Sequence, residues 1–401
     1  MRLKPELYRN RNFVLYSAGN AVSWLGLWGQ RIGIGWLSWD LSHAPFWVGI
    51  VSLAQFVPLI VSGPLFGAIL DRTDRKRYAL VTNAVLATLA LCLYGLTALN
   101  LMNIALLTFF GVLLGIANSA YQPIRLVLIN EIVRKEDLAA AIAAHSIIFN
   151  LTRSIGPALA GLVIAAFGLP AAFAFNAISY FAILGALGAM HFPVYVARGE
   201  RRHFFVELWA GVHYVIHQPQ IRELMLLSAV TSILGRSILE LMPVFADSVF
   251  HRGSAGLAAL TTATGCGAIG GAIGLSVASN HKWLPWLARQ GALWLGLLFA
   301  VFGLCTRYEQ ALAMVVLLGT AVVLCSVGLQ VILQSTIEDA YRGRVLSLWG
   351  MVNIAGPGVG AAALGGFAQW IDLTRVTVAS GVVCSCLVFA ILIRGRRPIK
   401  S

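Results

Sequence analysis

The sequence predicts an all-α membrane protein with twelve membrane-spanning helices in two bundles of six. Apolar residues make up 59% of its 401 residues and charged residues only 11%, whereas a soluble domain carries about 25% charged residues. Apolar runs near the ~20 residues that a spanning helix needs recur along the chain. A Gly-Pro pair occurs at Gly156-Pro157 and again at Gly356-Pro357, half a chain apart. These observations favour a transporter built from two repeats, with its path between them.

Each of twelve apolar runs is predicted to form one spanning helix. They lie near 13–38, 45–70, 78–99, 104–130, 138–168 and 170–192, then near 223–250, 255–279, 284–306, 310–337, 343–371 and 375–394. The first run is too long for a signal-peptide core, so we keep it as a helix. A proline in mid-helix removes a backbone donor, which lipid tolerates only beside other helices or a water-filled cavity. We therefore predict helix breaks at Gly156, Pro157, Gly356 and Pro357.

The longest polar connection follows the sixth span and divides the chain. We predict an N-terminal six-helix bundle at 1–192, a cytoplasmic linker at 193–222 and a C-terminal six-helix bundle at 223–401. Apolar side chains recur at helical spacing from Phe204 to Ile216. The linker is therefore expected to contain a short amphipathic helix that lies on the membrane surface.

The basic residues predict the orientation of the chain. Of 29 Lys and Arg, four lie in the interior of predicted spans, and only Arg252, Arg307 and Arg375 lie in or next to the loops on one side. All the others lie on the opposite side, which the positive-inside rule makes cytoplasmic, together with both termini. The net charge of +13 thus reflects topology and attraction to anionic lipids, and it requires no nucleic acid. We predict a multi-pass protein of the cell inner membrane.

The sequence offers little for catalysis. All six cysteines are predicted to lie within spans, where they suit packing better than disulfides or metal sites. An enzyme needs a nucleophile with its base, or a metal cluster, and neither pattern occurs. A non-transporting scaffold has no evident use for inward-facing polar stripes. We expect no enzymatic activity, no metal and no cofactor.

Polar side chains inside the predicted spans indicate where a cavity lies, because ionisable groups in a bilayer are costly and commonly functional. Several recur at helical spacing and so share one helix face. The candidates for a substrate cavity are Asn20, Trp24, Arg31, Asn118, Gln122, Arg125, Asn150, Arg153, Gln330, Gln334 and Asn353. Other roles stay open for these residues. They are hydrogen bonding between helices for the side-chain amides, binding of carbonyls at the helix breaks for Arg125 and Arg153, and a position at the membrane–water interface for Arg31.

One carboxylate, Glu240, is placed well inside a span. Arg236 precedes it by one helical turn, a spacing that allows a direct pair. Our hypothesis is that Glu240 couples transport to protons by exchanging Arg236 for a proton; the alternative is a static structural pair. Because four arginines in the spans outnumber this glutamate, the sequence favours an anionic substrate, such as a carboxylate or catecholate metabolite.

The loop after the second span carries the most specific motif. Gly67 is followed by Asp71, Arg72 and Arg75 in the order Gly-x-x-x-Asp-Arg-x-x-Arg-Lys, and the glycine is expected to let two helices approach. In this motif the chain resembles the major facilitator superfamily, whose signature has a second glycine where Asp74 stands. The Gly156-Pro157 segment is similar to the antiporter motif of that superfamily. The stretches 28–31, 123–125 and 149–153 are similar to its transmembrane secretion effector branch, which includes enterobactin-type siderophore exporters.

The resemblance implies a secondary transporter that works as a monomer, with two bundles rocking around a central cavity. It also implies a cytoplasmic gate of Asp71, Arg72 and Arg75, with Glu131 as a partner for one arginine. We expect a proton-coupled exporter, an antiporter, of a small anionic metabolite such as a siderophore. A multidrug efflux antiporter and a lysophospholipid flippase are the alternatives.

Overall fold

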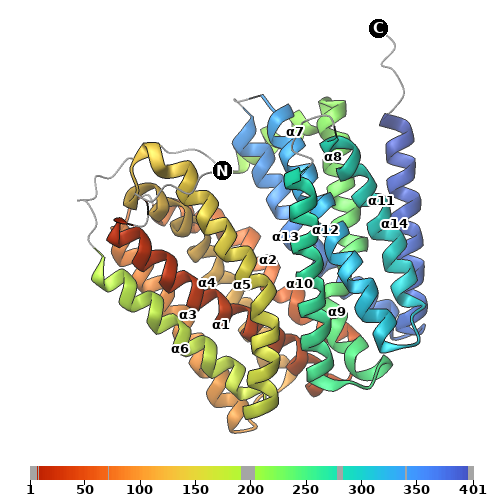
Figure 1. Cartoon of the computed structure of the whole chain (residues 1–401), viewed down its shortest axis with the longest axis horizontal. Coiled ribbons are helices and arrows are strands. Elements are labelled where there is room, and N and C mark those ends of the chain that lie inside the picture. Colours follow the sequence, from red (N-terminus) through yellow and green to blue (C-terminus); the bar gives the residue numbers. More distant parts are fainter. Residues whose placement is uncertain are drawn as a thin grey trace. The chain divides into compact units, whose positions relative to one another are not determined.

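The computed structural model describes residues 7, 9–70, 72–190, 204–277, 283–338 and 341–395, and the regular structure in these ranges is helical (Figure 1). The N-terminal helices are α1 (Arg11–Ser42), α2 (Pro45–Leu70), α3 (Arg75–Ala98), α4 (Ile104–Ile132), α5 (Leu138–Phe167) and α6 (Pro170–Ala189), with the 3₁₀ turn η2 (Lys135–Asp137) before α5. The C-terminal helices are α7 (Phe204–His217), α8 (Pro219–Val230), α9 (Ile238–Val244), α10 (Gly253–Val277), α11 (Leu284–Gly303), α12 (Tyr308–Thr336), α13 (Arg342–Phe367) and α14 (Leu373–Gly395).

Eleven segments in the described ranges are long and apolar enough to cross a membrane. Helix α1 has 32 residues but is more polar, because Asn20, Gln30 and Arg31 interrupt its apolar stretches. With α1 included, the segments give the twelve predicted spans. Cys305 differs from the prediction: α11 ends at Gly303, so this cysteine lies in the following loop.

The chain forms two compact units. One contains 1–41 and 54–200, and the other contains 42–53 and 201–401. Helix α2 is continuous from Pro45 to Leu70, so its first nine residues pack with the C-terminal helices and the rest with the N-terminal helices. In the first unit α3 packs against α4 and α6, and α5 against α4 and α6. In the second, α12 packs against α10 and α11, and α11 against α14.

Polar contacts hold the helix ends of the first unit. The carboxylate of Asp74 accepts from the Arg77 amide at 2.7 Å and caps α3, in place of the glycine of the family signature. Lys76 donates to the carbonyls of Gly188 and Met190 at the end of α6, at 2.9 and 2.7 Å. A cation is favourable there, because the free carbonyls make a helix C-terminus partly negative.

The seventh span is interrupted, which differs from the single helix that we predicted. Between α8 and α9 lies the π-helical turn η3 (Thr231–Gly235), and α9 continues into a second π-turn, η4 (Phe245–Val249). The Arg236 amide donates to the carbonyl of Thr231, five residues back, at 3.0 Å. A π-turn adds a residue to the helix ladder and changes which side chains share a face. Spacing along the sequence therefore does not decide whether Arg236 and Glu240 meet.

The predicted amphipathic helix of the linker corresponds to α7, whereas residues 191–203 of the linker lie outside the described residues. Gly211 packs closely against Arg344 and Leu348 of α13, and the rings of Tyr214 and Tyr341 stack at 4.2 Å. Trp209 is 74% exposed. The helix thus has one face on the C-terminal unit and a second face that includes an exposed tryptophan.

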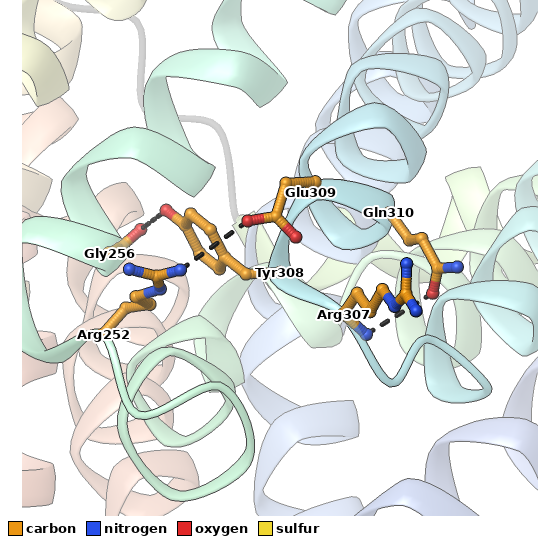
Figure 2. Close-up of polar contacts among 6 residues, drawn as sticks. All are labelled: Arg252, Gly256, Arg307, Tyr308, Glu309 and Gln310. Carbon is orange, nitrogen blue, oxygen red and sulfur yellow. Dashed lines mark hydrogen bonds and ion pairs between the residues drawn. The ribbon is translucent and has the colours of Figure 1, made fainter.

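Two loops of the C-terminal unit meet beside the start of α12 (Figure 2). The Tyr308 hydroxyl donates to the Gly256 carbonyl at 2.9 Å, and the Arg252 guanidinium lies 5.3 Å from the Tyr308 ring. Arg252 also pairs with Glu309 at 3.6 Å. Because both side chains of this ion pair are mostly exposed, the pair stabilises the loop only weakly.

Candidate functional site

Three arginines lie against aromatic rings inside the N-terminal unit. Arg125 of α4 lies 5.6 Å from the ring centroids of both Trp24 and Phe149. We call the wider group the arginine–aromatic cluster; it comprises Trp24, Trp28, Arg31, Phe56, Arg125, Phe149 and Arg153. Arg31 lies 5.5 Å from the ring of Trp28 and 5.3 Å from that of Phe56, and Arg153 lies 5.9 Å from the ring of Trp28.

A glycine allows this cluster to form. A Cβ added at Gly156 would lie 2.6 Å from Cβ of Trp28, so only glycine lets α5 approach α1 this closely. Helix α5 continues through Pro157 to Phe167, and α13 likewise continues through Pro357 to Phe367. The predicted breaks are thus positions where a helix lacks one backbone hydrogen bond without ending. At the second, Ser232 donates to the Val352 carbonyl at 3.1 Å, and Gly356 packs against Ser232.

His145 lies at the edge of the cluster. Its ring stacks on Tyr16 with centroids 5.5 Å apart and meets the edge of Trp24 at 4.6 Å. The residue is 6% exposed, and neither ring nitrogen has a hydrogen-bond partner among the described residues. Neither His145 nor Tyr16 is among the cavity candidates named from the sequence. The spacing of His145 and Phe149, four residues apart on one helix face, is the signal that links them.

Other cavity candidates of this unit make local contacts. Asn20 is fully buried: it donates to the Tyr16 carbonyl and accepts from the Tyr121 hydroxyl, both at 2.8 Å. Asn118 donates to the Leu114 carbonyl of its own helix at 2.8 Å, and Gln122 is partly buried. The side chain of Asn150 lies outside the described part of the structure. The contacts of Asn20 match interhelical hydrogen bonding, and its role in a cavity stays a prediction.

A polar chain runs through the C-terminal unit. Arg236 donates to Asn353 at 3.2 Å, Asn353 donates to the Trp349 carbonyl at 3.0 Å, and the Trp349 indole donates to Ser228 at 3.2 Å. These hydrogen bonds join α13 to the interrupted seventh span. Gln330 is partly buried and Gln334 exposed on α12.

Glu240 has a partner that sequence reasoning missed. The Ser52 hydroxyl, on the first turns of α2, donates to Oε2 of Glu240 at 3.2 Å. A serine 188 residues away carries no local signal of such a contact. The hydrogen bonds described here bring Arg236 to Asn353 and Glu240 to Ser52, and a direct exchange between Arg236 and Glu240 stays a hypothesis.

The predicted cytoplasmic gate is partly described. Arg75 at the start of α3 forms an ion pair with Glu131 near the end of α4. Asp71 lies outside the described residues, and Arg72 is exposed. The close helix approach expected at Gly67 is not seen in the described ranges, since a Cβ there meets nothing within 4 Å.

The arginine–aromatic cluster is chemically suited to an anion. A guanidinium offers several donors in one plane and pairs with a carboxylate through two of them. Aromatic faces attract the cation and position it without neutralising its charge. The cluster therefore has the positive charge and the hydrogen-bond donors that suit an oxyanion.

Comparisons with known proteins all indicate the same family. The model of the transmembrane secretion effector family matches residues 6–400. The staphyloferrin A transporter of Staphylococcus aureus (strain NCTC 8325 / PS 47) is 28% identical over 341 residues, covering 83% of this chain and 84% of that protein. The enterobactin exporter EntS of Escherichia coli O1:K1 / APEC is 26% identical over 375 residues, covering 89% and 86%.

Solved structures of transporters share the fold. A bacterial homologue of the human lysosomal transporter Spinster matches with a TM-score of 0.72 and 15% identity, covering 98% of this chain and 99% of its own. A bacterial homologue of the iron transporter ferroportin matches with a TM-score of 0.71 and 15% identity, covering 98% and 100%. These matches confirm the predicted all-α membrane fold of two six-helix bundles. The chain therefore belongs to the transmembrane secretion effector family of the major facilitator superfamily, and it is a multi-pass membrane transporter of small molecules, not an enzyme.

Proposed function

We propose that this protein exports a small anionic metabolite of the siderophore type, driven by protons that move inward. The observation that carries the proposal is the arginine–aromatic cluster, in which Arg31, Arg125 and Arg153 lie against aromatic rings. In a low-dielectric interior, three guanidinium groups favour a ligand of opposite charge. A catecholate or carboxylate supplies that charge, and a lipophilic cation does not.

The relatives support the same chemistry. Two proteins of similar length and 26–28% identity are named as a transporter of staphyloferrin A and an exporter of enterobactin. Identity at this level supports a shared class of substrate and leaves the particular molecule to experiment.

Proton coupling is assigned to Glu240. The carboxylate lies in the seventh span, four residues after Arg236 in the sequence, and it accepts a hydrogen bond from Ser52. A carboxylate inside a span can exist as the anion or the neutral acid, depending on its partners. We infer that it binds a proton in one stage of the cycle and releases it in the other.

The remaining proposals concern the orientation in the membrane, the cytoplasmic gate and the oligomeric state. The concentration of Lys and Arg in one set of loops supports an inner-membrane protein with both termini in the cytoplasm. The Arg75–Glu131 ion pair supports a gate at the cytoplasmic ends of α3 and α4, completed by Asp71 and Arg72. The protein is proposed to act as a monomer.

The export proposal is tested by comparing culture medium and cell extract by mass spectrometry. Three strains are grown in iron-rich and iron-poor medium: deletion, restored wild type, and restored Arg125→Ala. We expect one anionic metabolite to leave the medium and accumulate in the cells upon deletion, and its medium level to fall at least about tenfold with Arg125→Ala, because a lost charged hydrogen bond weakens binding by ~1.5–3 kcal/mol.

The matched control is Arg252→Ala, which removes an exposed arginine of the Tyr308 loop and should leave export unchanged. Loss of export in both variants at equal protein level would remove the cluster from the proposal. An unchanged medium in the deletion strain, with altered uptake or phospholipid turnover, would replace export by import or lipid flipping.

A further inference from the structure

An apolar groove lies within the N-terminal unit, between α2, α3 and α4. Its volume is about 420 Å³, within the range of ~300–1,000 Å³ that is typical of ligand pockets. The Tyr78 hydroxyl lies 3.1 Å from the Ala120 carbonyl oxygen of α4 and 3.3 Å from that of Phe66 of α2, so it ties the three helices together beside the groove. Ala117 and Ala120 are buried and line the groove. Their short side chains leave space that longer ones would fill.

The groove follows α3 over about the depth of one lipid leaflet. Its lining residues on this helix extend from Arg77 to Leu89 and are twelve residues apart, which is ~18 Å of helix. One leaflet contributes about half of the ~30 Å hydrocarbon core of a bilayer. Val81 and Val85 of α3 and Ile69 of α2 line the groove and are exposed. The groove therefore has the length and the apolar surface that suit one acyl chain.

The end of the groove beside the loop between α2 and α3 is basic. Residues 71–77 include four Lys or Arg and two Asp. Arg75 and Lys76 are engaged with α4 and α6, and the Asp74 carboxylate caps α3. The Arg77 side chain is exposed and lines the groove at this end. A guanidinium at the mouth of an apolar groove matches a phosphate joined to an acyl chain, and basic pockets between spanning helices bind anionic headgroups.

We propose that this groove binds one anionic phospholipid, with an acyl chain along Val81 and Val85 and the phosphate on the Arg77 guanidinium. The site is separate from the arginine–aromatic cluster and belongs to the N-terminal unit alone. Its loop lies on the side proposed to be cytoplasmic, where anionic lipids give the membrane surface a negative potential. The lipid is a bound partner of the fold, and its binding needs no transported substrate.

The headgroup contact is tested by native mass spectrometry of the purified full-length protein in detergent. Phosphatidylglycerol and phosphatidylcholine with the same acyl chains are added in turn. We expect the first phosphatidylglycerol to bind about fivefold more tightly than phosphatidylcholine, because a basic residue near an anionic headgroup contributes ~1 kcal/mol. Arg77→Gln should remove this difference, and Arg77→Lys should keep it. The matched control is Arg134→Gln, which removes an exposed arginine beyond the end of α4 and should leave the preference unchanged.

The acyl-chain contact is tested with the same lipids by filling the groove. Val85→Trp should weaken the binding of both lipids at least about tenfold, the equivalent of displacing about two buried methylene groups. Leu91→Trp is the control, because Leu91 is an exposed residue of α3 outside the groove. If Val85→Trp does not fold, Val81→Trp fills the same groove one turn away and should give the same loss.

Equal affinity of the wild-type protein for the two lipids would overturn the inference and leave only ordinary contact with the bilayer. A preference for phosphatidylglycerol that survives Arg77→Gln, or unchanged binding with tryptophan in the groove, would place the anionic lipid elsewhere and would also overturn it. Because none of these measurements involves transport, their outcome is independent of the export proposal.

Discussion

At the scale of single residues, the candidate site is determined by contacts that the residue types alone do not reveal. The arginines of the spans stand out in the sequence because ionisable residues are rare in lipid. Their partners do not: Phe149 and Tyr16 are ordinary apolar or aromatic residues of a spanning helix. The close approach of α5 to α1 at Gly156 brings these residues together.

Replacing Gly156 with alanine should therefore destabilise the N-terminal unit. The added Cβ would meet Cβ of Trp28 at 2.6 Å, and overpacking of this kind costs about 1–3 kcal/mol. Thermal unfolding of the purified protein in detergent should show a lower midpoint. Gly185→Ala is the control, because a Cβ there meets nothing within 4 Å and alanine favours a helix. A midpoint for Gly156→Ala equal to that of Gly185→Ala would contradict the packing argument.

At the scale of secondary-structure elements, helix ends and helix interruptions show where the sequence predicts the structure and where it does not. The charged motif before α3 predicted a gate, and its described part contains a cap at Asp74 and the Arg75–Glu131 ion pair. The seventh span differs, since a run that the sequence predicts as one helix contains two π-turns. Hydrophobic periodicity predicts that a helix exists but does not resolve one added residue within it.

Charge reversal tests the contribution of the ion pair. Arg75→Glu places two carboxylates side by side and should lower the unfolding midpoint, and adding Glu131→Arg should restore most of the loss. The side chains are 30% and 19% exposed, so the coupling energy in a double-mutant cycle should be about 0.5–1 kcal/mol. Additive effects of the two single changes would show that the pair contributes no energy. The same variants, assayed for export, would show whether the pair matters beyond stability.

At the scale of the whole molecule, the distribution of basic residues predicts the orientation in the membrane. Green fluorescent protein fused after Ser401 should fluoresce, and alkaline phosphatase at the same position should be inactive, because the C-terminus is expected in the cytoplasm. Fusions after Arg307 should give the opposite result, since that loop belongs to the side with few basic residues. Active phosphatase at Ser401 would reverse the proposed orientation.

The sequence by itself determined the membrane class, the number of spans and the family, because hydrophobic length, charge asymmetry and short motifs are local properties of the chain. It also marked Arg125, Arg153 and Glu240, whose charges are costly in lipid wherever they point. Only the tertiary structure decided their partners. The hydrogen bond between Ser52 and Glu240 spans 188 residues and joins α2 to α9. Such contacts arise from the relative placement of whole helices, for which a single sequence holds no direct signal.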